Sequence, residues 1–180
     1  MLKKILLGLA ALVLVLVAVI ATRPSDYRVE RSLIIEETPS RAYDVICNLK
    51  RWNEWSPWAH LDPAMKTTFT GTPCAPGSSY AWVGNDQVGE GRMTITEVHP
   101  PLQAKIKLEF LKPFTSTNET TFDLYVEKGG TRVVWIMNGH NGFVEKAVSL
   151  FMDFDKMIGP DFERGLATLK KGIEDGTIAR

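Results

Sequence analysis

The sequence predicts an α+β fold in which a curved antiparallel sheet wraps around a long C-terminal helix, preceded by an N-terminal transmembrane helix. Three observations predict it. An unbroken apolar run occupies residues 5–21, residues from 65 to 138 follow a period of two, and residues 158–173 carry apolar side chains at helical spacing. Because 44% of the 180 residues are hydrophobic, one core of ordinary size is expected. The predicted organisation is therefore an anchor at 1–22 and one domain at 23–180.

The N-terminal segment is basic first and then apolar. Two lysines precede the run from Ile5 to Ala21, which spans roughly 25 Å at the helical rise of 1.5 Å per residue. Basic residues before a span favour a cytoplasmic N-terminus, which would place the domain in the periplasm or outside the cell. The alternative is a cleaved secretory signal, because Val19 and Ala21 form a small-residue pattern before Thr22. The run is longer than an ordinary signal core, which favours the retained anchor.

The first elements of the domain are a strand and a helix. Alternating side chains from Tyr27 to Ile35 predict the strand. Thr38 can cap the helix that follows, and Pro39 suits its first turn. Pro57 prevents the tryptophan-rich segment that comes next from continuing as one long helix.

The middle of the chain reads as a series of short strands near 65–70, 78–83, 89–98, 102–111, 118–128 and 131–138. The strands from Ala104 to Phe110 and from Thr120 to Val126 alternate cleanly between apolar and polar residues. Strands of this kind have one covered face and belong to antiparallel sheets. Gly129 and Gly130 suit the hairpin that joins the last two strands.

The final helix is the predicted cover of that sheet. Its apolar stripe consists of Ile158, Phe162, Leu166, Leu169 and Ile173. Gly159-Pro160 is expected to break or restart it.

A further helix is expected from Phe143 to Phe154. Its wide apolar surface is explained most simply by core packing, and the alternative is a lid over a cavity that touches lipid.

Charge and cysteine content exclude several classes of function. Without the two lysines of the leader, the domain has 21 − 2 = 19 basic residues against 21 acidic ones, and a nucleic-acid partner needs a clustered basic surface. Cys47 and Cys74 have no Cys-x-x-Cys spacing, so neither a metal nor another cofactor is expected. Two unpaired cysteines are at least as plausible as one disulfide. The oligomeric state is left open.

No residue pattern identifies a reaction. The nucleophile elbow, the Walker A motif and the dinucleotide fingerprint are all absent. His60, His99 and His140 lie in apparent loops or at strand ends. Glu90 and Arg92 share a strand face and are the most suggestive acid–base pair, although a solvated face explains them more simply. Residues 118–120 match a glycosylation acceptor that begins a strand.

Several short motifs accompany this order of elements. They are Trp52-x-x-Trp55-Ser56-Pro57-Trp58, Asp62-Pro63, Gly84-Asn85 with Gly89-x-Gly91-x-Met93, and Asp155-Lys156-Met157-Ile158-Gly159-x-Asp161-Phe162-x-x-Gly165-Leu166. With them, residues 27–175 resemble the START-like superfamily, whose helix-grip members are labelled polyketide cyclase/dehydrase or SRPBCC proteins, and in particular its membrane-anchored bacterial branch. The superfamily shares no catalytic motif, so no catalytic residue is carried over.

The resemblance implies a cavity between the curved sheet and the last helix that holds a hydrophobic or lipid-like small molecule. The residues expected to line it are Trp55, Trp58, Tyr80, Trp82, Met93, Ile106, Leu108, Phe122, Phe162 and Leu166. The tryptophans of residues 52–58 either contact that ligand or plug one end of the sheet. Two other functions stay open: a cyclase-like or hydrolase-like enzyme acting on such a ligand, and an envelope interaction protein that docks through exposed indoles.

Overall fold

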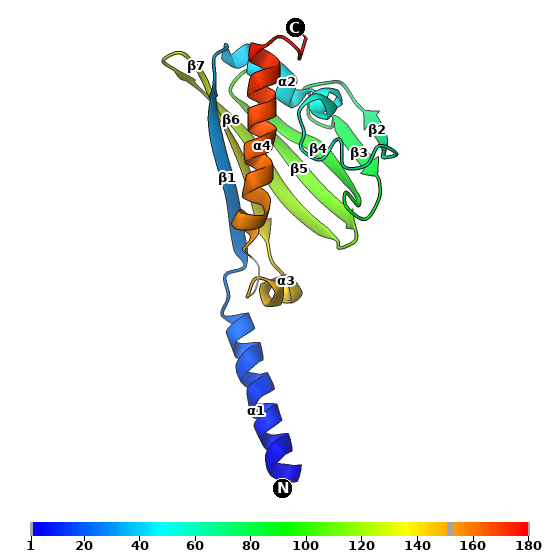
Figure 1. Cartoon of the computed structure of the whole chain (residues 1–180), viewed down its shortest axis with the longest axis vertical. Coiled ribbons are helices and arrows are strands. Elements are labelled where there is room, and N and C mark those ends of the chain that lie inside the picture. The colour runs from blue at the N-terminus through cyan, green and yellow to red at the C-terminus, as the bar shows by residue number, and fades with distance from the viewer. Residues whose placement is uncertain (1, 151–152, 180) are drawn as a thin grey trace.

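A computed structural model of the chain describes residues 2–150 and 153–179, and its core is a seven-stranded antiparallel sheet with a long helix across one face (Figure 1). The strand order is β1-β7-β6-β5-β4-β3-β2, so only β1 pairs out of sequence, with the last strand. The strands are β1 (Asp26–Ile35), β2 (Lys66–Thr70), β3 (Ser79–Val83), β4 (Glu90–His99), β5 (Gln103–Lys112), β6 (Ser116–Glu127) and β7 (Gly130–His140). Every predicted strand is present, and its ends fall within two residues of the predicted limits.

The long helix α4 (Phe154–Glu174) begins at a capped residue and runs without interruption. The carboxylate of Asp153 accepts hydrogen bonds from the backbone N–H groups of residues 155 and 156. The predicted break at Gly159-Pro160 is therefore wrong. A proline near the start of a helix removes a single internal hydrogen bond, and tertiary contacts can offset that loss.

Arg31 of β1 supplies those contacts on both sides of the proline. Its guanidinium lies 2.7 Å from a carboxylate oxygen of Asp155 and 2.7 Å from one of Glu163. The hydrogen bond from Arg31 lowers the pKa of Asp155 below its ordinary value. Gly159 leaves room for the guanidinium, which occupies the position of an added Cβ. The helix is thus fastened to β1 across its weakest turn.

Two short helices and a disulfide close one end of the sheet. Helix α2 (Pro39–Cys47) is capped by Thr38 as predicted, and it contacts β5, β6 and β7. The 3-10 helix η1 (Leu49–Glu54) follows. Cys47 and Cys74 form a disulfide with their Cα atoms 4.7 Å apart, which decides between the two alternatives that the sequence left open. Sequence spacing does not reveal this pairing, because the β2–β3 loop reaches α2 only in the folded sheet.

The Asp62-Pro63 and Gly84-Asn85 motifs meet in space. The buried carboxylate of Asp62 accepts hydrogen bonds from the backbone N–H groups of Asn85, at 2.7 Å, and Ala64, at 2.9 Å. Gly84 lies against the same carboxylate, where a Cβ has no room. These motif residues therefore hold two loops together, which is a structural role.

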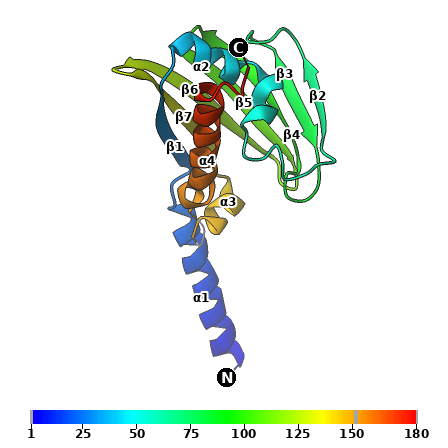
Figure 2. The same cartoon turned by 45° about the horizontal axis from the view of Figure 1, so that its top comes forward.

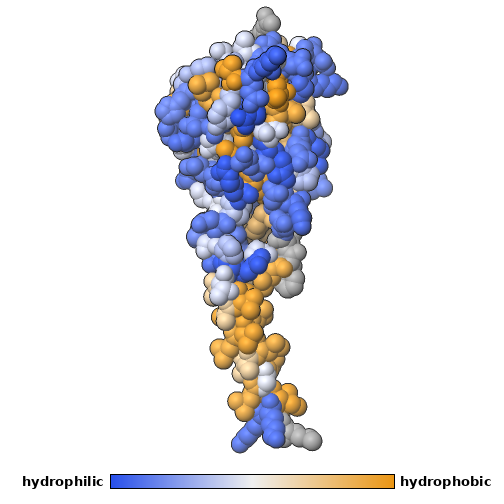
Figure 3. All heavy atoms as spheres, turned by 90° about the vertical axis from the view of Figure 1, so that its left-hand side faces the viewer, coloured by the Kyte–Doolittle hydropathy of each residue, from blue (hydrophilic) through white to orange (hydrophobic). Residues whose placement is uncertain are grey.

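Helix α1 (Leu2–Ala21) projects away from the sheet, and its surface is almost entirely hydrophobic (Figures 1 and 3). Ile20 is the one buried residue among those described in it. Within the described part of the chain, it is the one helix that is long and apolar enough to cross a membrane. A signal sequence can also meet this criterion of length and composition.

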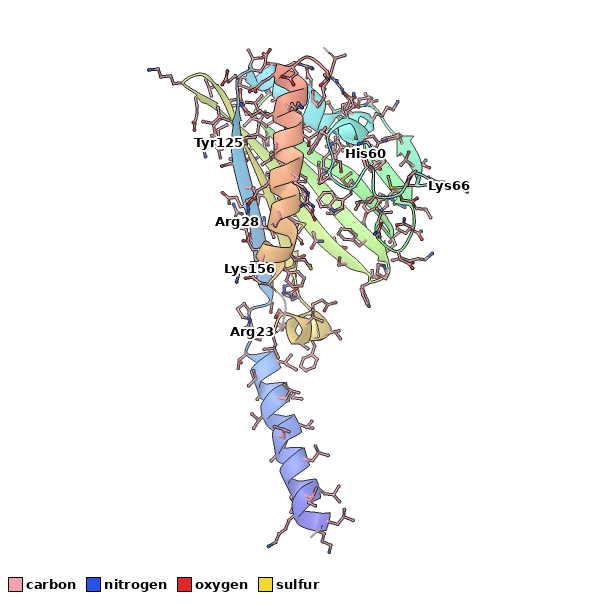
Figure 4. The ribbon with its side chains drawn as sticks, viewed as in Figure 1. Arg23, Arg28, His60, Lys66, Tyr125 and Lys156 are labelled. Carbon is pink, nitrogen blue, oxygen red and sulfur yellow. A yellow bond between two sulfur atoms is a disulfide. The ribbon has the colours of Figure 1, made fainter. Side chains whose placement is uncertain are left out.

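Helix α3 (Phe143–Val148) corrects the prediction of a longer helix over 143–154. Residues 151 and 152 of that range lie outside the described residues. Core packing is also wrong for α3 itself, because Phe143 is 52% exposed and Val144 is 69% exposed. The helix lies beside the C-terminal end of α1 (Figures 1 and 2). Arg23 reaches it there and donates a hydrogen bond to the carbonyl of Ser149 at 3.2 Å (Figure 4).

Candidate ligand-binding site

The strand register defines two ends of the sheet. Asp26 pairs with His140 and Glu90 with Lys112, so these residues lie at one end, which also carries α1 (Figure 1). We call it the α1 end. The opposite end, where Ile35 pairs with Thr131, carries α2 and the disulfide, and we call it the far end.

Aromatic side chains pack solidly between the sheet and the helices towards the far end. Trp135 stacks on Phe162 of α4 with ring centroids 3.9 Å apart, and on Phe122 at 5.0 Å. Trp52 and Trp55 meet both Trp135 and Phe122 edge to face or tilted, at 5.4–6.1 Å. Both of these indoles are buried, so they plug the sheet and do not form an exposed docking patch.

The α1 end is hollow. A cavity of about 530 Å³ lies between α4 and strands β3 to β7. Its wall consists mainly of aromatic and aliphatic side chains. The residues that line it are Tyr27, Trp52, Asn53, Ser56, Trp58, Ala59, Met65, Tyr80, Trp82, Gln87, Val88, Met93, Leu108, Phe110, Ser116, Asn118, Thr120, Trp135, Met137, Phe154, Met157, Ile158, Asp161 and Phe162. Many of these residues belong to the α1 end of their strands or to the first half of α4.

Six of the ten residues predicted for the site line this cavity. They are Trp58, Tyr80, Trp82, Met93, Leu108 and Phe162. The other four, Trp55, Ile106, Phe122 and Leu166, lie in the solid core next to it. The difference follows from position along each element. Leu108 is the next inward-facing residue of β5 after Ile106 in the direction of the α1 end. Phe162 is likewise one helical turn closer to the α1 end than Leu166.

The sequence did not point to the polar part of the wall. The Tyr27 hydroxyl donates a hydrogen bond to Oδ1 of Asn118 at 2.8 Å. Burial raises the pKa of the Tyr27 phenol, so the ring stays neutral and remains a donor at ordinary pH. Asn118 was noticed only as part of a glycosylation acceptor, yet its side chain is buried and faces the cavity. The inward face of β6 was the available signal, since Asn118 and Thr120 continue the apolar face of that strand.

Other polar groups on the wall are mostly satisfied. The indole N–H of Trp82 donates to the carbonyl of Val88 at 3.0 Å, and the Tyr80 hydroxyl lies 3.5 Å from Oδ1 of Asn53. Burial also raises the pKa of Tyr80. Two groups of the described lining residues are buried and have no hydrogen-bond partner, namely the Thr120 hydroxyl and the Trp135 indole N–H.

The residues considered for catalysis lie elsewhere. His60, His99 and His140 are exposed and do not line the cavity. Glu90 pairs with Lys112 at 2.8 Å, and Arg92 is exposed on the outer face of β4. Asp161 is the one carboxylate on the described wall, and it pairs with Arg164. Among the described residues, no group of three or more His, Cys, Asp or Glu is placed to hold a metal ion.

Comparisons with known proteins identify the fold. No family model matches the chain, and no curated protein matches it. Several solved structures do. A protein from Rhizobium leguminosarum has a TM-score of 0.61 at 15% identity, over 83% of this chain and 95% of its own. CV1439 from Chromobacterium violaceum has a TM-score of 0.58 at 13% identity, over 84% and 99%. Ara h 8.0201 has a TM-score of 0.55 at 12% identity, over 86% and 99%.

The chain has the helix-grip fold of START-like and Bet v 1-like proteins. This fold wraps a curved antiparallel sheet around a long C-terminal helix, as predicted from the sequence. The apolar N-terminal helix precedes it. Identities of 11–16% among such structures establish the fold and leave the function to be argued from the site.

Proposed function

We propose that this domain binds a hydrophobic or lipid-like small molecule in the cavity at its α1 end, and that α1 holds the domain at a membrane. The cavity carries the proposal. Its volume of about 530 Å³ lies within the range of about 300–1,000 Å³ that is common for small-molecule sites, and its wall is mostly apolar and aromatic. A space of this size in a core that is otherwise closely packed is expected to have a purpose, because packing would otherwise fill it.

Three features support the membrane tether and the side on which the domain lies. Helix α1 has the length and composition of a span, and Lys3 and Lys4 favour a cytoplasmic start. The Cys47–Cys74 disulfide suits the oxidising space beyond a bacterial membrane. The exposed apolar side chains of α3 lie beside the end of α1, where the headgroup region of a bilayer would be.

An enzyme that acts on the same ligand is the second candidate. Asp161 and the Tyr27–Asn118 pair place polar atoms on an apolar wall, which an acid–base reaction requires. Turnover of a bound ligand, followed by mass spectrometry against the Asp161→Asn variant, would separate an enzyme from a binding protein.

Binding can be tested by filling the cavity. We expect an apolar fluorescent probe to bind the purified full-length protein saturably, and Leu108→Trp to weaken that binding about tenfold or more because the indole occupies the cavity. The matched control is Leu111→Trp, the same change on the outward face of β5. Equal binding by the two variants, or the absence of saturable binding by the unchanged protein, would contradict the proposal.

The tether is tested separately by sequencing the N-terminus of the mature protein from membranes. A start at residue 1 or 2 supports the anchor. A start at Thr22 would refute it and leave the cavity proposal standing.

A further inference from the structure

We infer that the ligand carries a neutral acceptor oxygen, such as the carbonyl of an ester or ketone, and that Asn118 and Tyr27 bind this oxygen inside the cavity. The inference rests on the proposed function and narrows the class of ligand. It starts from the Tyr27–Asn118 pair, which is joined by a 2.8 Å hydrogen bond on the inward faces of β1 and β6, within a wall made mostly of hydrocarbon.

The surrounding residues fix the position of this pair. The Tyr27 ring stacks on Phe154 of α4, with centroids 4.7 Å apart and an interplanar angle of 20°. On its other side it lies over Gly139 of β7, where an added Cβ would collide with both the Tyr27 ring and Oδ1 of Asn118. A side chain at position 139 would therefore push the pair apart. The tyrosine and the asparagine are held in place from both sides, as a preorganised binding group should be.

The pair has one donor more than it uses. Asn118 is only 4% exposed and its Oδ1 accepts the Tyr27 proton, whereas its amide N–H group makes no hydrogen bond to another described residue and is not fully enclosed. The oxygen and nitrogen of an amide are assigned from such networks, and the reverse assignment is also possible. In that case the amide donates to the phenol oxygen and the phenol proton is left over. Either arrangement leaves one donor at the cavity wall that has no acceptor within the protein.

An apolar ligand that fills the cavity would bury this donor without an acceptor, which costs free energy, whereas an acceptor oxygen on the ligand avoids that cost. The charge of the wall sets the nature of that oxygen. Among the described lining residues there is no lysine, arginine or histidine, and the one ionisable carboxylate is Asp161. An anionic ligand such as a fatty-acid carboxylate would lie buried without a counter-charge, which is unfavourable. A neutral carbonyl oxygen meets the donor without that cost.

Three probes of equal chain length separate these cases: dodecane, methyl dodecanoate and dodecanoate at pH 8. Each is used to displace an apolar fluorescent probe from the full-length protein in detergent-free nanodiscs. We expect methyl dodecanoate to displace the probe at about tenfold lower concentration than either of the others. Equal potency of the ester and the alkane would overturn the inference and leave the proposed function intact. Failure of all three, together with failure of the probe to bind saturably, would overturn the proposed function itself.

Variants of Asn118 and Tyr27 test whether this pair causes the preference for the ester. Asn118→Leu keeps the approximate volume and removes the donor, so it should abolish the advantage of the ester while dodecane binds as before. Asn53→Leu is the matched control, because Asn53 also lines the cavity but is exposed. Tyr27→Phe keeps the stack on Phe154 and serves as a second variant in case Asn118→Leu fails to fold; it should reduce the advantage of the ester. An undiminished ester preference in both Asn118→Leu and Tyr27→Phe would refute the assignment.

Discussion

The two ends of the sheet are built from the same strands but differ in packing. Towards the far end, Phe122 and Trp55 are fully buried and pack edge to face under the helices. At the α1 end, the same β6 strand presents Asn118 and Thr120 to an open cavity. Two positions along β6, from Thr120 to Phe122, separate the cavity wall from the packed core. Stability and binding are therefore expected to depend on different parts of the sheet.

The largest expected effect comes from removing a ring at the far end. Phe122→Ala should lower the free energy of unfolding by about 4 kcal/mol, because the lost ring leaves a void among rigid neighbours. Phe110→Ala makes the same change on the cavity wall, where the ring already lacks partners on one side, and should cost about 1–2 kcal/mol. Denaturant unfolding of both variants measures the difference. Similar losses would mean that the two ends are equally packed.

The disulfide should affect stability and leave binding almost unchanged. Cys47→Ala with Cys74→Ala removes a cross-link between residues 27 positions apart, and we expect a loss of about 3 kcal/mol. The cross-link lies at the far end, so the affinity for an apolar probe should change by less than about twofold at a temperature where the variant is folded. Thermal unfolding and probe titration of the same samples check this. A large loss of affinity would show that the far end supports the cavity.

The smallest expected effect is a gain. The Thr120 hydroxyl is buried with no partner among the described residues, and the residue is 3% exposed. Thr120→Val replaces the hydroxyl with a methyl group of similar size and should raise the free energy of unfolding by up to about 1 kcal/mol. Chemical denaturation measures the change. A clear loss of stability would indicate that the hydroxyl has a partner, such as a bound ligand, which copurification and mass spectrometry can detect.

The fold could be predicted from the sequence because the signals for each element are local. The apolar alternation of β5 and β6, the capping Thr38 and the stripe of α4 each lie within a few residues of one another. The break at Gly159-Pro160 was predicted wrongly because the contacts of Arg31 with Asp155 and Glu163 come from a strand about 130 residues away. The sequence left the disulfide undecided for the same reason, because Cys47 and Cys74 come together only in the folded chain.

The site was predicted less completely. Alternation identifies which face of a strand is inward, but it does not show where along that face the helix stands away from the sheet. Ile106 and Leu108 are equivalent by pattern, yet only Leu108 borders the cavity. The roles of Asn118 and Gly139 could not be predicted because they depend on Tyr27. This residue belongs to the first strand, β1, and is far from both of them in the sequence.

The link between α1 and β1 limits where this domain can work. It consists of residues 22–25, and four residues extend at most about 14 Å. Arg23 is held by Ser149, and the carbonyl of Ser25 accepts a hydrogen bond from the backbone of Asn141, so both ends of the link are fastened. With α1 in a bilayer, the same face of the domain would always turn towards the lipid, and the domain could not travel across a compartment. The domain would stay at the membrane surface and exchange ligand with that membrane or with carrier proteins that come to it.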